Sequence, residues 1–371
     1  MIAFYNGIVF NGEEFLNNVA VLIKNNLIAD VISSSEIPSG IERFDLEGNY
    51  LVPSFIDLQL YGGNGKLFSH ELSFDSIDAT DAYCISGGCT RFFITMATNT
   101  LEKLKRGIEV VVAYQKENKK GLLGLHLEGP FINPIKRGAH LEHCIKQPTT
   151  EIIKYLLDKS EGVIKMMTLA PECCSDEVIQ LLLEHGVLVS AGHSNATYMQ
   201  ATSAFNNGIS AVTHIFNAMS PLQGREPGMV GAVYDHANIT SSIVCDGVHT
   251  DYASVRISKK ILKERLFLIT DAVAETTEGE YQHLFKQDRY TLPDGTLSGS
   301  ALTMMKAINN CVDEVGISLE ESLRMASTYP AKVANIESQF GKIEKGFCAD
   351  LTVMSKDRVI KKVMRNGMFV S

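Results

Sequence analysis

The sequence predicts an α/β protein with a (β/α)8 barrel of the TIM type and a small β-sandwich domain formed from both chain termini. Three observations carry this prediction. The middle of the chain alternates apolar strand segments with helical segments, and the two ends hold short strands and turns. The 371 residues have an ordinary globular composition, with 45% hydrophobic and 21% charged residues.

The two ends of the chain predict a separate β domain. Asparagine-led turn signals punctuate the first fifty residues at Asn6-Gly7, Asn11-Gly12 and Asn25-Asn26. The last segment has the same character, with Asn366-Gly367 as a hairpin signal. We therefore expect residues 1–50 and 344–371 to form the β domain, and residues 51–343 to form the barrel.

Eight apolar segments are the predicted barrel strands: 51–60, 91–97, 122–129, 163–170, 187–193, 209–216, 240–246 and 266–271. The predicted helices are 101–119, 151–159, 175–185, 196–207, 251–264, 303–315 and 318–328. Ser175 and Gly186 mark the two ends of one helix, and Ser318 with Glu321 forms a capping box. The number and order of strands favour a barrel, with a doubly wound open sheet as the structural alternative.

Composition restricts the partners of the chain. The net charge of −9 disfavours binding to nucleic acid or to an anionic membrane, although a local basic pocket can still bind a small anion. No apolar run reaches the length of a membrane span, and no basic residue precedes Lys24, so a secretory signal is not expected. In this context the eight cysteines are expected to be reduced, which predicts a cytoplasmic protein.

Four residues with metal-binding or acid–base chemistry lie where a predicted strand gives way to a loop. Glu128 ends the third strand, His193 the fifth, His214 lies near the end of the sixth, and Asp271 ends the eighth. A single histidine at a strand end is more often a hydrogen-bonding loop residue. The strands of a barrel, however, all open at their C-terminal ends onto one face, so these four side chains can converge.

One carboxylate and two imidazoles are a usual ligand set for a catalytic zinc that keeps a position for water. We therefore predict that Glu128, His193 and His214 bind the metal. Asp271 is predicted to take a proton from water and to pass it to the leaving nitrogen. His126 lies two residues before Glu128, on the same side of the strand, and we expect it to orient the site rather than to bind the metal.

Longer motifs around these residues resemble the N-acetylglucosamine-6-phosphate deacetylases of the amidohydrolase superfamily. The motifs are HLEGPF (126–131), KRGAH (136–140), LAPE (169–172), GHSNATY (192–198), THIFNAMSPLQGREPGMVGA (213–232), CDGVH (245–249), TDA (270–272) and LSGSALTMM (297–305). LVPSFID (51–57) and GKIEKGFCADLTV (341–353) resemble the junctions of the superfamily with its small β domain. The likeness spans the whole barrel.

The resemblance implies hydrolysis of a linear amide, the acetamide of N-acetylglucosamine 6-phosphate, by a homodimer whose subunits share active sites. It implies the same metal ligands and Asp271 as the acid/base, with His140 and His249 as further catalytic residues at the carbonyl or the phosphate. The implied substrate-binding residues are Gln59, Ala139, His140, Asn217, Ala218, Arg225, His249, Leu297, Ser298 and Gly299. The Arg225 guanidinium suits a phosphate.

One departure concerns the first strand, where many amidohydrolases carry His-x-His for a second metal. The chain has Gln59-Leu60-Tyr61 there, and neither Gln59 nor Tyr61 is a good zinc ligand. We therefore predict one divalent metal per subunit, zinc first, although Fe(II), Co(II) and Mn(II) suit the same ligands. N-acetylgalactosamine 6-phosphate or another N-acyl compound is the alternative substrate. A non-catalytic scaffold is disfavoured because all four core residues are present.

Overall fold

The computed structural model describes residues 1–117 and 120–371. The chain divides into two compact units. One is Met1–Asp57 with Tyr83–Arg91 and Thr303–Ser371, and the other is Leu58–Ala82 with Phe92–Leu302. Strands β8 (Phe55–Leu60) and β11 (Cys89–Ala97) have residues in both units. The domain limits predicted at residues 50, 51, 343 and 344 therefore stay a prediction.

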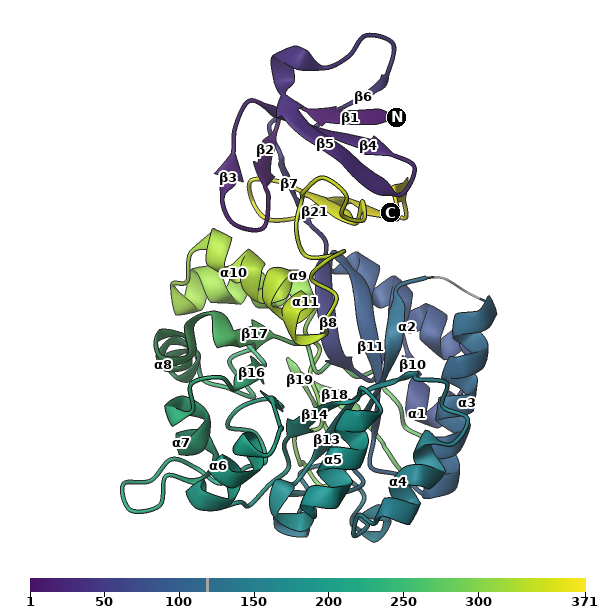
Figure 1. Cartoon of the computed structure of the whole chain (residues 1–371), viewed down its shortest axis with the longest axis vertical. Helices are drawn as coiled ribbons and strands as arrows, with labels where there is room; N and C mark the ends of the chain where they lie inside the picture. Colours follow the sequence, from purple (N-terminus) through teal and green to yellow (C-terminus); the bar gives the residue numbers. More distant parts are fainter. Residues whose placement is uncertain (118–119) are drawn as a thin grey trace. The chain divides into compact units, whose positions relative to one another are not determined.

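The terminal unit contains two sheets built from both chain ends (Figure 1). One sheet has the order β5-β4-β1-β6 and consists of β1 (Ile2–Tyr5), β4 (Val19–Lys24), β5 (Leu27–Ser33) and β6 (Glu42–Asp45). The other has the order β22-β21-β20-β7-β2-β3 and consists of β2 (Ile8–Phe10), β3 (Phe15–Leu16), β7 (Tyr50–Pro53), β20 (Leu351–Met354), β21 (Ile360–Arg365) and β22 (Met368–Phe369). Phe4 and Val21 from the first sheet share one core with Leu51 and Leu351 from the second. The predicted β-sandwich is confirmed.

The asparagine-led turns join these strands in two ways. Asn11-Gly12, Asn25-Asn26 and Asn366-Gly367 lie between strands that pair antiparallel, so each forms a hairpin. Asn6, with a φ of +56°, turns the chain without forming a hairpin, because β1 pairs with β4 and β6 while β2 pairs with β3 and β7. This turn carries the chain from one sheet of the sandwich to the other.

The barrel sheet has eight strands in the order β17-β16-β15-β14-β13-β12-β11-β8. Besides β8 and β11 they are β12 (Leu122–Glu128), β13 (Ile164–Leu169), β14 (Leu188–Ala191), β15 (Ala211–Val212), β16 (Thr240–Ile243) and β17 (Leu266–Leu268). Every residue of β8 and β11 is buried, as expected for parallel strands that are covered on both faces. The predicted barrel is confirmed.

The barrel closes just beyond β17. The backbone N–H of Asp271 donates to the carbonyl of Gln59 at 3.0 Å, and the N–H of Tyr61 donates to the carbonyl of Ala272 at 2.8 Å. Ala272 also forms a bridge with Ser300. The segment that joins the last strand to the first is therefore the one that carries Asp271.

The predicted strand 51–60 is wrong in one respect, because it is two strands. Residues Tyr50–Pro53 form β7, which pairs with β2 and β20 in the sandwich, whereas β8 begins at Phe55. Between them the N–H of Ser54 donates to the carbonyl of Asp350, and its hydroxyl hydrogen-bonds that of Thr352. Both strands are buried apolar runs, so hydropathy alone does not separate them.

All seven predicted helices have a counterpart in the structure. They are α3 (Leu101–Glu117), α4 (Thr150–Leu157), α5 (Asp176–Glu184), α6 (Tyr198–Asn206), α8 (Tyr252–Leu262), α9 (Met304–Asn310) and α10 (Leu319–Ala326). The predicted helix 101–119 has its last two positions outside the described residues, and the predicted helix 303–315 continues beyond α9 as a π-helical turn, Cys311–Val315. Ser175 and Ser318 accept the N–H bonds that cap α5 and α10, as expected, whereas the Glu321 carboxylate of the predicted capping box contacts Arg324 and Tyr329. Residue 328 belongs instead to α11 (Thr328–Val333).

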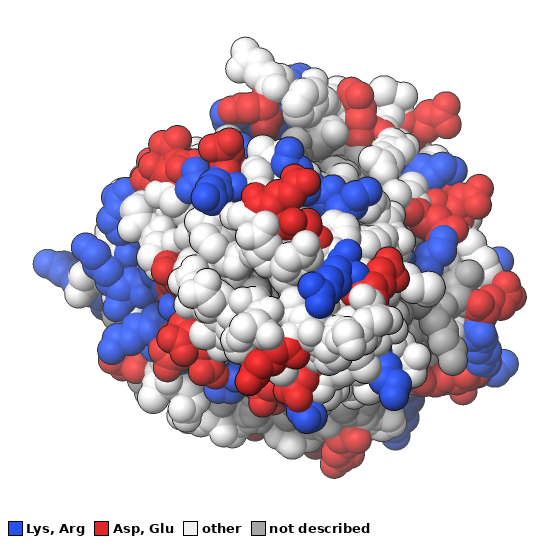
Figure 2. Space-filling view, turned by 90° about the horizontal axis from the view of Figure 1, so that it is seen from above, with Lys and Arg blue, Asp and Glu red and all other residues white. Residues whose placement is uncertain are grey.

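In the part of the chain that the structure describes, four α-helices were not predicted: α1 (Phe68–Glu71), α2 (Phe74–Ser86), α7 (Gly228–Asp235) and α11. In Figure 1 helices α3 to α8 lie around the barrel strands. Within the described residues, no helix has both the length and the apolar character to cross a membrane. All eight cysteines are free, as predicted. On the face that Figure 2 presents, basic and acidic side chains are intermingled.

Candidate active site

Three histidines surround the carboxylate of Glu128, which is only 1% exposed. Its Oε1 atom lies 3.2 Å from Nε2 of His193 and 2.9 Å from Nε2 of His214. Its Oε2 atom lies 3.2 Å from Nε2 of His140. Burial opposes ionisation of Glu128, yet these three histidines hold its pKa well below the ordinary value. The carboxylate is therefore charged.

Three of the four predicted strand-end residues have an unusual backbone conformation. His193, His214 and Asp271 have φ angles of +48°, +35° and +56°, in the left-handed region that side chains other than glycine rarely adopt. Each follows a barrel strand directly or within a few residues. Such strain costs about 1–3 kcal/mol per residue and persists only where the surrounding structure holds it. Other residues with positive φ, such as Asn6, Asn25 and Asn366, lie in turns, so these three stand out because they also lie just after barrel strands.

The two predicted histidine ligands present Nε2 to Glu128. In His193 the other ring nitrogen, Nδ1, lies 3.0 Å from the carbonyl oxygen of Lys136 and can only donate to it, so Nε2 keeps its lone pair. His214 is fixed by its backbone N–H, which donates to the Ser242 hydroxyl at 2.8 Å. Among the described residues, Nδ1 of His214 is buried without a partner. Both rings can therefore offer a nitrogen to a metal beside Glu128.

His140 differs in its protonation. The backbone N–H of Thr98 donates to Nδ1 of His140 at 3.2 Å, and the Thr98 hydroxyl is 2.8 Å from the same nitrogen. The Nδ1 atom is thus an acceptor, and the proton of the neutral ring lies on Nε2, which faces Glu128. Burial lowers the pKa of His140 to about 4, so the ring is neutral near pH 7. A ring in this state donates a hydrogen bond rather than binding a metal.

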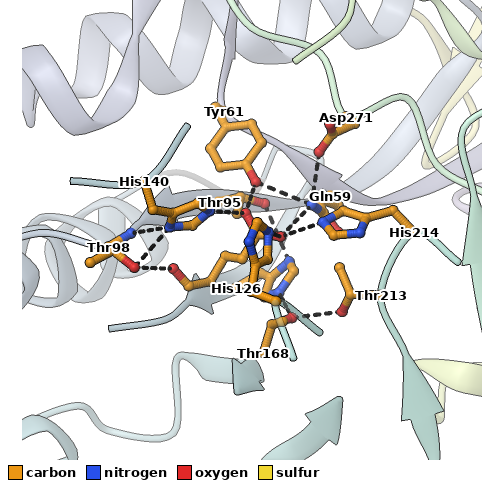
Figure 3. Close-up of polar contacts among 12 residues, drawn as sticks. Gln59, Tyr61, Thr95, Thr98, His126, His140, Thr168, Thr213, His214 and Asp271 are labelled. Atoms are coloured by element: carbon orange, nitrogen blue, oxygen red, sulfur yellow. Dashed lines mark hydrogen bonds and ion pairs between the residues drawn. The ribbon is translucent and has the colours of Figure 1, made fainter. Parts of the chain in front are cut away.

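At the end of β8, Gln59 contacts the carboxylates of Glu128 and Asp271, and Tyr61 contacts that of Glu128 (Figure 3). The Nε2 atom of Gln59 donates to Oδ1 of Asp271 at 2.8 Å and to Oε1 of Glu128 at 3.1 Å. The Tyr61 hydroxyl donates to the other oxygen of Glu128. Burial, followed by the charges of Glu128 and Asp271, raises the pKa of Tyr61 well above its ordinary value. Hydrogen-bond donors thus stand where a His-x-His pair would supply ligands.

His126 lies away from Asp271 and is fully buried. Its Nε2 atom is 2.7 Å from the Thr168 hydroxyl, which is itself 2.7 Å from the Thr213 hydroxyl. In Figure 3 Thr168 and Thr213 lie side by side below His126. Burial lowers the pKa of His126 to about 4. The ring belongs to a buried hydroxyl network, and its predicted role in orienting the site stays a prediction.

A cavity of about 350 Å³ opens beside these groups. Most of the predicted site residues line it: Glu128, Ala139, His140, His193, His214, Asn217, Ala218, His249, Asp271, Leu297, Ser298 and Gly299. His249 is held by Asp246, whose Oδ2 lies 2.6 Å from its Nδ1. Burial raises the pKa of Asp246, but the hydrogen bond and charge of His249 outweigh this effect and hold it below its ordinary value.

Two predicted substrate-binding residues do not line the cavity. Gln59 lies behind Glu128 and Asp271, which it contacts. Arg225 is exposed in the loop before α7 and lies outside the lining. The structure of one chain therefore does not bring Arg225 to the other site residues.

The sequence reasoning missed several lining residues, among them Tyr61, Leu67, Val273, Tyr281, His283 and Thr296. The alternation of β8 is the signal for Tyr61, because residues 59 and 61 share one side of a strand. Tyr281 and His283 precede a hairpin of β18 (Leu284–Lys286) and β19 (Arg289–Thr291), and no strand-end pattern marks them. Tyr281 donates to the carbonyl of Thr98 at 2.6 Å and so contacts the residue that holds His140.

The donor set fits a divalent metal. Ligand atoms of Glu128, His140 and His193 lie within 4.8 Å of one another, and Nε2 of His214 is beside the same carboxylate. Carboxylate oxygen with imidazole nitrogen suits zinc and other first-row metals. Of the three histidines, His193 donates from Nδ1 to a carbonyl, so its neutral ring has the lone pair on Nε2, whereas His140 accepts at Nδ1 and has its proton on Nε2.

Comparison with known proteins gives a consistent result. A family model described as "Amidohydrolase family" matches residues 50–370, and one described as "NagA composite domain" matches residues 1–51. The chain is 36% identical to the N-acetylglucosamine-6-phosphate deacetylase of Haemophilus influenzae, over 98% of both chains. It is 30% identical to the N-acetylgalactosamine-6-phosphate deacetylase of Shewanella sp. (strain ANA-3), over 94% of this chain and 90% of the relative.

Solved structures agree. The N-acetylglucosamine-6-phosphate deacetylase from Pasteurella multocida superposes with a TM-score of 0.96 at 34% identity, covering 100% of this chain and 99% of the other. A mutant of the enzyme from Mycobacterium smegmatis, in complex with N-acetyl-D-glucosamine-6-phosphate, superposes with a TM-score of 0.92 at 28% identity, covering 100% and 98%.

Proposed function

We propose, since the chain belongs to the amidohydrolase family, that it hydrolyses the acetamide of N-acetylglucosamine 6-phosphate to glucosamine 6-phosphate and acetate. The observation that carries this proposal is the convergence of Glu128, His193, His214 and Asp271 on one cavity. The substrate follows from the relatives named above, which match nearly the whole length of the chain.

The proposed metal ligands are Glu128, His193 and His214. They would bind one divalent cation per subunit, and zinc is the preferred candidate. A cation held there would polarise the substrate carbonyl and lower the pKa of water, which makes attack at neutral pH feasible. The Gln59 amide and the Tyr61 hydroxyl donate to Oε1 and Oε2 of Glu128, and because neither group is a good metal ligand, they support a single cation. Fe(II), Co(II) and Mn(II) suit the same donors.

The remaining chemistry belongs to side chains of the chain. The Asp271 carboxylate accepts the proton of the attacking water and then passes it to the departing nitrogen as the C–N bond breaks. Its Oδ1 atom accepts a hydrogen bond from the Gln59 amide at 2.8 Å, and such a donor favours the carboxylate over the acid. His140, with a proton on Nε2, donates toward the carbonyl oxygen as negative charge develops on it. Asp246 holds His249 with Nε2 free for the substrate.

The phosphate has a proposed partner in Arg225. A guanidinium binds a phosphate with two parallel hydrogen bonds, which suits an acidic protein with a net charge of −9. The exposure of Arg225 outside the cavity lining is consistent with a homodimer in which each subunit completes the site of the other. The homodimer and the cytoplasmic location stay proposals.

The second candidate substrate is N-acetylgalactosamine 6-phosphate. It differs from the first in the configuration of one hydroxyl, and a deacetylase of that substrate is 30% identical to this chain. The lining residues Ser298 and Asn217 can both donate and accept hydrogen bonds. The configuration of one hydroxyl therefore does not exclude either sugar.

Acetate release is the experiment that tests the proposal. The purified protein is supplied in turn with N-acetylglucosamine 6-phosphate, its galactosamine epimer and unphosphorylated N-acetylglucosamine, and kcat/KM is compared. We expect the first substrate to be preferred and the unphosphorylated sugar to be poorest. Arg225→Ala should raise KM for the phosphosugars alone. No acetate from either phosphosugar, at a confirmed metal content, would refute the proposed function.

A further inference from the structure

The carboxylate of Glu172 accepts three hydrogen bonds close to the proposed metal site. Glu172 ends the LAPE motif and lies in the 3-10 turn Pro171–Cys173, just after β13. The Ser194 hydroxyl donates to its Oε2 atom at 2.7 Å. The Asn195 backbone N–H and the Asn133 side-chain amide donate to Oε1 at 2.6 and 2.9 Å. The proposed mechanism gives this carboxylate no role.

Two of the three donors belong to the residues that directly follow His193. The left-handed backbone of His193, with a φ of +48°, turns the chain sharply at this point. Because a strained conformation persists only when its surroundings hold it, bonds to Ser194 and Asn195 on the same carboxylate stabilise the turn. Glu172 thus holds the backbone of His193 from its C-terminal side.

The third donor holds the ring of His193. The backbone N–H of Asn133 donates to the carbonyl of His193 at 2.9 Å. The side-chain oxygen of Asn133 accepts from the N–H of Ile135. This second bond caps the turn Pro134–Lys136. The carbonyl of Lys136 at the end of that turn faces Nδ1 of His193 at 3.0 Å. A closed circuit of contacts therefore runs from His193 through Glu172 and Asn133 and back to the His193 ring.

We propose that Glu172 is a positioning residue, which fixes both the backbone and the ring of His193 so that Nε2 faces the metal. The inference rests on the proposed function, in which His193 is a ligand. Three donors converge on Glu172, so both of its oxygens must be acceptors. A glutamine of the same shape has one acceptor oxygen in place of two and no negative charge, so it holds the three donors more weakly. Loss of such a partner behind a ligand typically weakens metal binding by about 10–100-fold.

Metal binding measures this role directly. Metal-free wild-type protein and Glu172→Gln are titrated with Co²⁺, and both the Kd and the visible absorption of the bound ion are recorded, since the bands report the ligand geometry. We expect a Kd about 10–100-fold higher for Glu172→Gln and shifted bands at saturation. The matched control is Glu177→Gln, an exposed glutamate five positions later, which should bind as the wild type does.

A milder variant keeps the test decisive if Glu172→Gln fails to fold. Ser194→Ala removes one of the three donors and should raise the Kd several-fold in the same direction. A wild-type Kd and spectrum in Glu172→Gln, or in Ser194→Ala where the first variant is unfolded, would overturn the positioning role. Failure of the wild-type chain to bind Co²⁺ would instead overturn the proposed function.

Discussion

The side-chain amide of Gln59 donates a hydrogen bond to the carboxylate of Asp271, with Nε2 2.8 Å from Oδ1. The same nitrogen lies 3.1 Å from Oε1 of Glu128. An amide donor favours the charged form of the carboxylates it contacts and brings no charge of its own. Gln59 therefore favours the charged carboxylate of Asp271, which is the form that the proposed proton transfer requires.

Substitution of Gln59 should shift the pH dependence of turnover. Gln59→Leu removes the donor to Asp271, so the charged form loses about 1.5–3 kcal/mol. The pKa of Asp271 should therefore be higher in the variant than in the wild type. Because the base form then dominates only at higher pH, the acid limb of the kcat/KM profile should move upward. An unshifted acid limb would show that Gln59 does not control this proton.

Substitutions of Asp271 and of Glu128 should have different effects on metal content. Asp271→Asn removes the proton acceptor and leaves the proposed ligands in place, so kcat should fall by about 10²–10⁴-fold or more at unchanged metal content. Glu128→Gln should lose metal as well as activity, because an amide oxygen is a much weaker ligand. Elemental analysis alongside steady-state kinetics checks both. Normal turnover in Asp271→Asn would exclude the proton-transfer role.

Removal of the metal should abolish activity and lower the melting temperature. A ligand present at 1,000 times its Kd stabilises the folded state by about 4 kcal/mol. Differential scanning fluorimetry of chelated protein, with zinc added back in steps, measures the effect. One equivalent per chain should restore both properties, and His193→Asn should show little response. A requirement for two equivalents would contradict the single-metal site.

Tyr281 should matter through its hydroxyl. The Tyr281 hydroxyl donates to the carbonyl of Thr98. The N–H and the hydroxyl of Thr98 in turn contact Nδ1 of His140. Tyr281→Phe leaves a buried acceptor without its donor, which costs about 1–3 kcal/mol. We expect kcat to fall about tenfold or more while the metal content stays the same. Tyr290→Phe removes a hydroxyl from the same segment and serves as the control. Equal kcat values in both variants would disprove the link to His140.

His283 should make stability depend on pH. Burial lowers its pKa from 6.5 to about 4, so between these values the unfolded chain binds a proton that the folded chain does not. The free energy of unfolding is therefore unaffected by this group above pH 6.5. It decreases as the pH falls toward 4, by on the order of 3 kcal/mol at most. His283→Gln should therefore lose less stability on acidification. Urea midpoints at pH 7 and 4.5 on metal-free protein measure the difference, with exposed His185→Gln as the control.

The barrel strands were predictable because buried parallel strands are continuous apolar runs. Glu128, expected at the end of the third strand, is the last residue of β12. The helices were predictable where a cap marks them, as Ser175 marks α5. Helix α7 was not, because its sequence GMVGAVYD contains two glycines and has low helical propensity. Six of its residues are buried, and tertiary packing stabilises it.

The ligands were easier to predict than the residues that orient them. A strand end and a residue type suffice to identify His193 as a candidate ligand. The contact between Tyr281 and Thr98 joins residues 183 positions apart, and no local pattern predicts it. Tyr61 was considered only as a metal ligand and dismissed as a poor one, although its place on β8 puts its hydroxyl against Glu128. Long-range hydrogen bonds decide such roles.

The closure of the barrel at Asp271 has a consequence for the order in which function arises during folding. Gln59 and Asp271 are 212 positions apart, so their contact carries a high loop-closure cost and depends on the first and last strands meeting. Glu128, His193 and His214 follow strands in the middle of the sheet and can come together before that event. During refolding, a chain should therefore acquire metal before it acquires turnover. Recovered activity then reports that the two ends of the sheet have joined.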